Sequence, residues 1–190
     1  EIGSGLVGSE MCIRDRCITG HRPNNLYGYR KKGKYEILGN TIFNLIEKLY
    51  IQSNRHITLI NGGALGADQI FALESINLKN KYKYDNNAEI KLVLVKPCLQ
   101  QDKLWQPSLQ NRYKEICSHM DEIITINQEY TKSCMKERNM YMVDNSDIVI
   151  AVKRDNVWGG TQQCFKYALS KGKEIILINP ETLLMKRNNK

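Results

Sequence analysis

The sequence predicts a single α/β domain in which a mainly parallel sheet lies between two layers of helices. Two observations support this. Short apolar runs alternate with longer segments of helical periodicity, and the apolar runs are continuous rather than alternating with polar residues. Strands of that kind are buried on both faces, as in a parallel sheet covered by helices. The predicted fold is therefore a Rossmann-like three-layer domain.

The expected strands share β-branched, apolar composition and are bounded by glycine, proline or polar residues. They cover residues 17–20, 56–61, 90–95, 122–126, 147–152 and 174–178. Pro97 is expected to end the third run and Pro180 the last. Residues 181–190 are expected to be a polar tail, frayed from Met185 onward.

The expected helices carry apolar residues at spacings of three and four. They cover residues 35–50, 65–78, 133–144 and about 160–170, and residues 104–120 form a mixed amphipathic segment. Ser133 is a candidate N-cap, and Gly172 is well placed to cap the end of the last helix. The polar stretch 79–87 is expected to be a loop.

Composition excludes several classes of protein. The 190 residues are 42% apolar and 25% charged, which suits one globular domain. No run of about 18 apolar residues and no secretory signal is found, so a cytoplasmic protein without a membrane partner is expected. The six cysteines form no C-x-x-C pair and no metal-ligand spacing with histidine, which favours reduced thiols and no metal site.

The formal net charge is +8. A basic balance favours anionic partners such as nucleotides, nucleic acid or an acidic protein surface. The charge is scattered along the chain, however, so an origin in a lysine- and asparagine-rich proteome explains it equally well.

Residues 1–16 differ in character from the rest. The stretch VGSEMCIRDR (7–16) resembles the translated read-through of a transposon-type sequencing adapter. We therefore expect a non-native segment at 1–16 and a native domain at 17–180; the alternative is a natural flexible tail. Without 1–16, the basic residues fall from 28 to 26 and the acidic ones from 20 to 17, a net charge of +9.

Glycine-containing turns follow three of the expected strands. In the first, Gly20 permits close backbone approach, His21 has a hydrogen-bonding ring, and Arg22 has a guanidinium suited to phosphate or carboxylate. An ordinary surface loop is the alternative. In parallel strands all such turns lie at the same edge of the sheet, where ligands bind.

The second turn, NGGALGAD (61–68), leads into a helix. Free N–H groups after Gly62 and Gly63 are suited to an anion, and Gly66 either serves the ligand or allows tight helix–sheet packing. Asp68 either complements the helix dipole or bonds a ribose hydroxyl.

The third turn places Gly159, Gly160 and Thr161 at a helix start, directly after Trp158. Two glycines and a hydroxyl there form a compact phosphate site, or else a helix start with a threonine cap. The turn lacks the Gly-Lys-Ser/Thr of a Walker A loop and the G-x-G-x-x-G of dinucleotide-binding folds.

Further candidates lie near these turns. Arg138 and Asn139 belong to the helix before the 147–152 strand; Arg138 either reaches a phosphate or pairs with an acidic neighbour on the exposed face. Trp158 adjoins the glycines and is the better candidate for stacking on a base, whereas Trp105 is better explained by packing.

In order and spacing, TGHRP (19–23), NGGALGAD, KPCLQQDKLW (96–105), MKERNMYMVDNSDIVIAV (135–152) and WGGTQQCFKYA (158–168) resemble the YpsA family. That family belongs to the SLOG superfamily of Rossmann-like proteins, which includes DprA and the LOG hydrolases. The resemblance covers about residues 17–180. It implies a SLOG-type fold, a nucleotide or nucleotide-derived ligand, and a bacterial or phage protein, with links to cell division or stress in some relatives.

One position departs from the LOG pattern. LOG hydrolases carry P-G-G-x-G-T-x-x-E, and Cys164 stands here where that glutamate would be. Without the carboxylate, cleavage of an N-glycosidic bond lacks its expected acid/base group. This argues against LOG-type hydrolysis and leaves catalytic residues unassigned.

Three functions follow as hypotheses. The first is a non-catalytic or weakly catalytic protein that binds or senses a nucleotide, with no cofactor assigned. The second is a nucleotide-cleaving enzyme of the phosphoribohydrolase kind. The third, by analogy to DprA and from the positive charge, is a single-stranded nucleic-acid binder. The sequence leaves the oligomeric state open, a homo-oligomer included.

Overall fold

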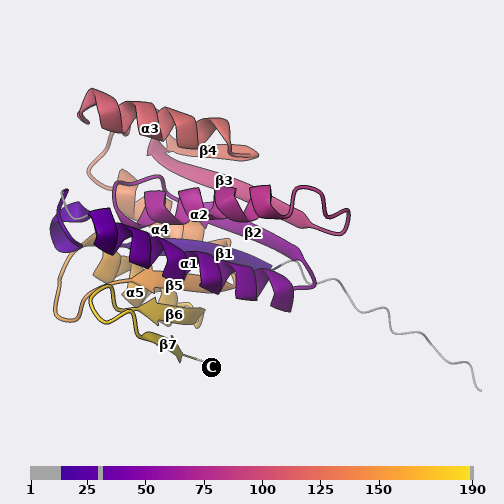
Figure 1. The fold of residues 1–190 in the computed structure, drawn as a ribbon. Coiled ribbons are helices and arrows are strands. Elements are labelled where there is room, and N and C mark those ends of the chain that lie inside the picture. Colours follow the sequence, from indigo (N-terminus) through magenta and orange to yellow (C-terminus); the bar gives the residue numbers. More distant parts are fainter. Residues whose placement is uncertain (1–13, 30–31, 189–190) are drawn as a thin grey trace, which may run out of the picture.

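The computed structural model describes residues 14–29 and 32–188. In this part of the chain, seven strands form one sheet in the order β4-β3-β2-β1-β5-β6-β7 (Figure 1). The strands are β1 Arg14–Gly20, β2 His56–Asn61, β3 Glu89–Cys98, β4 Glu122–Asn127, β5 Ile148–Val152, β6 Glu174–Ile178 and β7 Met185–Asn188. The helices are η1 Pro23–Asn25, α1 Lys32–Gln52, α2 Ala67–Lys81, α3 Pro107–Ser118, α4 Cys134–Asp144 and α5 Gly160–Ser170.

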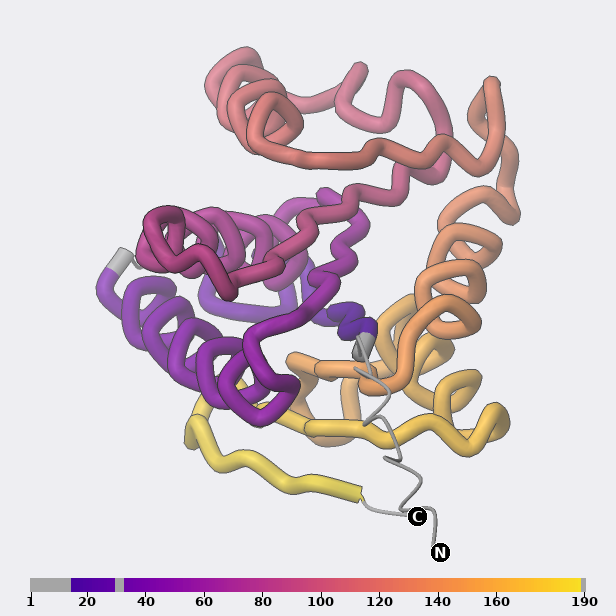
Figure 2. Tube along the Cα trace, turned by 90° about the vertical axis from the view of Figure 1, so that its right-hand side faces the viewer, coloured from indigo at the N-terminus to yellow at the C-terminus, as the bar shows by residue number. Residues whose placement is uncertain are grey.

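The fold is the predicted Rossmann-like three-layer domain. All ladders are parallel except the antiparallel pair of β6 and β7. The helices α1, α2 and α3 cover one face, and α4 and α5 cover the other, as the view along the sheet in Figure 2 shows. Apolar clusters fill the space on both sides, and all five residues of β5 are buried.

The strand order reverses at β1. The chain builds β2, β3 and β4 outward on one side of β1, then α4 brings it back to β5 on the other side. The carboxyl ends of β1 and β5 therefore diverge into loops on either side of a crevice, the position where open α/β sheets bind ligands.

The first strand begins earlier than expected, at Arg14 rather than Cys17. Arg14, Asp15 and Arg16 pair with β2, and Arg16 is 1% exposed and donates from Nη2 to Ser53 Oγ. These residues are ordered because β1 lies at the centre of the sheet between two partners. Residues 1–13 of the expected non-native segment lie outside the described residues.

Two further expectations about strands were wrong. Pro97 does not end the third strand, because β3 continues to Cys98. The last β2–β3 pair is Asn61 with Leu94, so the missing N–H of Pro97 costs no bond to β2. The tail is not frayed at Met185 but forms β7, which covers the edge of β6.

The helices agree more closely with expectation. Gly172, at φ +62°, ends α5 in a Schellman motif, in which its N–H and that of Lys173 bond to Leu169 O and Ala168 O. Ser133 occupies the N-cap position of α4, but its hydroxyl makes no cap bond there. None of the described helices is long and apolar enough to cross a membrane.

Candidate functional site

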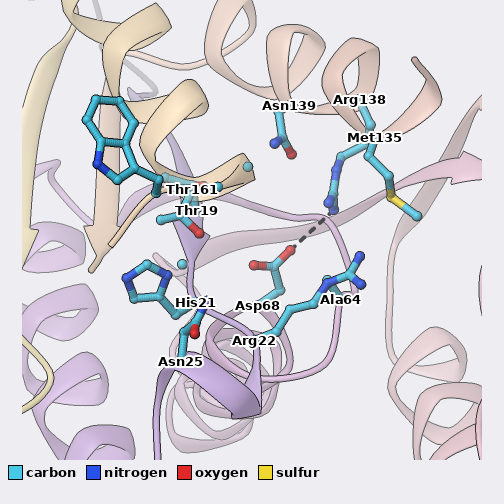
Figure 3. A pocket seen from close by; sticks show the side chains of 14 residues that line it. Thr19, His21, Arg22, Asn25, Ala64, Asp68, Met135, Arg138, Asn139 and Thr161 are labelled. Carbon is cyan, nitrogen blue, oxygen red and sulfur yellow. Dashed lines mark hydrogen bonds and ion pairs between the residues drawn. The ribbon is translucent and has the colours of Figure 1, made fainter. Parts of the chain in front are cut away.

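A pocket of about 170 Å³ lies at the crevice beside β1 and β5 (Figure 3). Its walls come from the turns after β1, β2 and β5 and from one side of α4. The lining residues are Thr19, Gly20, His21, Arg22, Asn25, Ala64, Asp68, Met135, Arg138, Asn139, Trp158, Gly159, Gly160 and Thr161.

Ten candidates from the sequence meet in this one pocket. They are Gly20, His21, Arg22, Asp68, Arg138, Asn139, Trp158, Gly159, Gly160 and Thr161. Residues more than 130 positions apart are brought together because the strands are parallel and their following turns share one edge.

The other three candidates, Gly62, Gly63 and Gly66, do not line the pocket. A Cβ at Gly62 would lie 1.2 Å from Arg138 Nη1, and one at Gly66 would lie 2.4 Å from His21 O. Gly63 instead faces α3, where a Cβ would lie 2.7 Å from Tyr113 Cε2. These glycines affect the site indirectly. Because they have no side chain, the Arg138 side chain, the backbone at His21 and the ring of Tyr113 can each pack close to the second turn.

An ion pair forms part of the pocket wall. Arg138 Nη1 lies 3.2 Å from Asp68 Oδ2, and both side chains are more than 90% buried. Burial raises the pKa of Asp68, and the Arg138 guanidinium opposes that shift. The sequence suggested an ion pair on the exposed face for Arg138 and a helix-dipole role for Asp68. Neither suggestion anticipated that the two residues form a buried ion pair with each other. Arg138 Nε has no hydrogen-bond partner among the described residues.

His21 contributes a second buried polar atom. The residue is 3% exposed, and its Nε2 has no partner within the described chain. Burial lowers the pKa of His21, and the nearby Lys153 and Arg154 lower it further. The ring is therefore neutral at pH 7 and is suited to a hydrogen bond with an uncharged ligand group. In Figure 3 Asn25 lies beside the ring, whereas the side chain of Arg22 extends away from it, toward Asp68 and Ala64.

The helix α5 begins at the pocket wall. Its N-cap, Gly159, has φ +150°, a conformation that favours glycine. A Cβ added at Gly159 or Gly160 would meet no heavy atom of the described residues within 4 Å. The first N–H groups of a helix have no intrahelical acceptor, so this end offers anion-binding donors next to open space.

The two tryptophans differ as expected. Trp158 is 76% exposed, and Lys166 Nζ lies 4.7 Å from the centre of its ring. Trp105 packs edge-on against Tyr113, with ring centres 5.3 Å apart, next to a small apolar cluster between α2, β3 and α3. Only Trp158 is therefore available to a ligand at this pocket.

Four lining residues were missed in the sequence. Thr19, Asn25, Ala64 and Met135 lie within or next to the motifs that were singled out. Met135 is three residues before Arg138, one helical turn along the same face of α4. The spacing could have indicated that Met135 lies next to the site. No such indication exists for Asn25, because the short helix η1 brings this residue to the pocket.

Cys164 lies outside the pocket lining and is 5% exposed. Burial raises the pKa of Cys164 to about 11, so the thiol is neutral at pH 7. Asp68 is the one carboxylate among the described lining residues, and it is paired with Arg138. No group of three or more potential metal ligands occurs in residues 14–29 and 32–188.

The chain was compared with models of known protein families. The profile of YpsA, described as the YspA SLOG family, matches residues 16–183. The chain belongs to this family. The YpsA-family match includes every residue of the pocket, β1 from Arg16 onward and the whole of β2 to β6.

Two curated relatives are similar in sequence. The SPbeta prophage-derived protein YoqJ of Bacillus subtilis (strain 168) is 32% identical over 143 residues, which cover 69% of this chain and 80% of YoqJ. A UPF0398 protein of Brevibacillus brevis is 25% identical over 115 residues, 60% of this chain and 58% of that protein.

Among solved structures, DNA processing protein A (DprA) from Streptococcus pneumoniae is similar in fold, with a TM-score of 0.58 at 15% identity. The similarity covers 89% of this chain and 51% of the DprA chain, so this chain spans about half of DprA.

Proposed function

We propose that this protein binds a nucleotide or a nucleotide-derived ligand in the pocket between β1 and β5. One observation carries the proposal: the free N-terminus of α5 opens into the same small pocket as the Asp68–Arg138 pair and the unpartnered Nε2 of His21. A helix N-terminus suits a phosphate, and buried neutral and acidic groups suit hydroxyls.

The start of α5 favours an anion at one side of the pocket, and the Asp68–Arg138 pair lies at another side (Figure 3). The exposed guanidinium of Arg22 lies near Asp68 and adds a positive charge there (Figure 3). A ligand with a phosphate at the start of α5 and hydroxyls near the ion pair matches this arrangement. The family membership and the SLOG-type fold support the same class of ligand.

An enzyme that cleaves a nucleotide is the less favoured function. The LOG pattern of N-glycosidic cleavage uses a glutamate, a carboxyl group free to exchange a proton near the reacting bond. Cys164 is buried behind the pocket with a raised pKa, and Asp68 is engaged by Arg138. Binding without turnover is therefore the better match to the residues present.

The test is calorimetry with a panel of nucleotides. Gly160→Asp adds bulk and negative charge where the phosphate is expected, so it should abolish binding. Gly33→Asp makes the same change on an exposed part of α1 away from the pocket and should leave binding intact.

Arg22→Ala removes one charge-assisted contact, worth about 1.5–3 kcal/mol, so affinity should fall about 10- to 150-fold. Arg112→Ala, an exposed arginine on α3, is the matched control. Melting curves of all four variants check that each is folded. Removal of an exposed arginine should hardly change the melting temperature. If both pocket variants fold and bind like the parent protein, the site lies elsewhere; if no nucleotide binds the parent, the proposal fails.

A further inference from the structure

A second hollow, of about 320 Å³, lies beside the loop between β5 and α5. Trp158 lines both cavities, so this outer hollow is a neighbour of the inner pocket described above. The residues that line the outer hollow are Lys153, Asp155, Asn156, Val157, Trp158 and Gln162. The proposed function uses none of its polar groups, of which Lys153 is buried and Gln162 half-buried.

Lys153 is a buried cation without a counterion. It directly follows β5, where its N–H bonds to Ile178 O at 3.1 Å, and the residue is 8% exposed. Its ammonium lies 5.4 Å from the centre of the Phe165 ring, but within residues 14–29 and 32–188 it forms no ion pair. The aromatic face attracts the ammonium without neutralising it. Because lysine is almost never buried unless it is paired, an unpaired ammonium beside a hollow indicates an anionic ligand.

The neighbours of Lys153 allow this interpretation. Arg154 is engaged by Glu181, with Nη2 and Oε1 3.1 Å apart, so it does not take the place of Lys153. Asp155 is the one carboxylate among the described residues that line the hollow; it is exposed and makes no ion pair with Lys153. The half-buried amide of Gln162 has N–H groups that suit the same anion.

The charge of Lys153 also acts on the inner pocket. Burial lowers the pKa of His21, which lines that pocket, and the nearby Lys153 lowers it further. A ligand that occupies the inner pocket can therefore extend past Trp158 toward the ammonium. Lysine suits a phosphate at such a position, because its ammonium is a point charge with three N–H donors.

From this arrangement we propose that the outer hollow holds a second phosphate of the ligand and that Lys153 pairs with it. The preferred ligand then carries two phosphate groups, one for each cavity, and a nucleoside monophosphate fills only part of the site. This inference rests on the proposed function and adds to it a residue that determines specificity.

The experiment is calorimetry of the full chain with AMP, ADP and adenosine 3′,5′-bisphosphate. ADP carries its second phosphate next to the first, whereas the bisphosphate carries it on the other side of the ribose, so the two probes test two positions of the second anion. At least one of them should bind about 10- to 150-fold more tightly than AMP, the effect of one charge-assisted contact.

Variants of Lys153 test its part in this preference. Lys153→Met and Lys153→Gln remove the charge and keep an unbranched side chain, so both should abolish the preference for a second phosphate and leave AMP binding nearly unchanged. Lys114→Met, which removes an exposed lysine on α3 outside both cavities, is the matched control for net charge and should keep the preference. Asp155→Asn should strengthen the binding of the preferred probe, because it removes a negative charge from the hollow.

Melting curves distinguish this role from a structural one. Replacing a buried charge by an apolar side chain of similar volume is often neutral or stabilising, so Lys153→Met should melt at or above the temperature of the parent protein. If Lys153 instead serves the fold by pairing with Asp155, then Lys153→Met and Asp155→Asn both lower the melting temperature, and this result overturns the inference.

The binding outcomes separate the inference from the proposed function. If AMP binds and neither probe with two phosphates binds more tightly, the inference fails and the proposed function stands. A preference for two phosphates that survives in folded Lys153→Met and Lys153→Gln has the same meaning. Binding of none of the three probes overturns both the inference and the proposed function for this class of ligand.

Discussion

Gly62 and Gly66 influence the pocket without lining it. At Gly62 the absence of a side chain leaves room for the Arg138 guanidinium, and at Gly66 it lets the turn before α2 contact the backbone at His21. The Ala67 N–H then bonds to His21 O at 3.2 Å, which ties the second turn to the first. Both glycines are thus needed to hold His21, Asp68 and Arg138 in place.

Gly66→Ala should destabilise the protein strongly. The new Cβ would meet backbone at 2.4 Å, and the residue has φ +100°, where side chains are strained. Gly28→Ala is the control, because Gly28 also has positive φ, +73°, but no described heavy atom lies within 4 Å of its added Cβ. Urea denaturation should show a loss for Gly66→Ala at least about 2 kcal/mol greater than for Gly28→Ala. Equal losses would mean that the contact with His21 is easily relieved.

His21 should make stability depend on pH. Its pKa in the folded protein lies below the unfolded value of 6.5, so the unfolded chain binds more protons as the pH falls below about 6.5. The free energy of unfolding therefore decreases in that direction. In His21→Asn, which does not titrate, the decrease between pH 7.5 and 5.5 should be smaller, as measured by urea denaturation at each pH. The same slope in both proteins would rule out this histidine as the cause.

Among the elements, β1 supports the rest of the sheet because it alone touches both halves. Its first residues carry specific bonds: Asp15 O accepts from the Asp147 N–H at 2.8 Å, and Arg16 reaches Ser53. Arg16 is therefore part of the folded domain, although the sequence analysis expected a non-native segment at 1–16 and a domain that begins at residue 17.

Two truncations test this. Deleting residues 1–13 should leave the melting temperature unchanged, because the pairing of β1 with β2 begins at Arg14. Deleting 1–16 should remove about 2–5 kcal/mol of stability, since several backbone bonds and the buried Arg16 contacts are lost. Equal melting temperatures for the two truncated proteins would show that the strand tolerates a start at Cys17.

Most elements could be predicted from the sequence because their apolar runs are long and buried. The strands at 56–61 and 174–178 coincide with β2 and β6. Pro97 and β7 could not be predicted, since both depend on the edges of the sheet. Pro97 lies beyond the last β2–β3 pair, so β2 does not need its N–H, and the polar β7 is held by pairing with β6 rather than by its own composition.

At the scale of the whole molecule, the location of the site followed from topology, but its inner chemistry did not. Parallel strands bring their following turns to one edge, which sufficed to group Arg22, Asp68 and Gly160. The contact between Asp68 and Arg138 joins residues 70 positions apart, and no local pattern reports it. A glycine that makes room for such a contact also looks the same in sequence as one that touches a ligand.

The net charge of +8 allows a separate prediction about nucleic acid. Any binding of single-stranded DNA should be electrostatic, so the affinity should fall steeply between 50 and 200 mM salt. Fluorescence anisotropy with a labelled oligonucleotide measures this, and Arg22→Ala should have no larger effect than Arg112→Ala. Tight binding at 200 mM salt that Arg22→Ala abolishes would instead favour a nucleic-acid interface at the pocket.

The placement of the pocket also constrains the kinetics of folding. The pocket wall includes Thr19 on β1 and Thr161 on α5, which are far apart in the sequence. The Asp68–Arg138 pair joins two residues that are 70 positions apart and so closes a long loop of the chain. No partly folded chain with only one side of the sheet assembled contains the complete site. A ligand that needs all of these residues therefore binds the native state alone and stabilises it by mass action. If the contacts of the ligand are absent from the folding transition state, such a ligand slows unfolding without speeding folding.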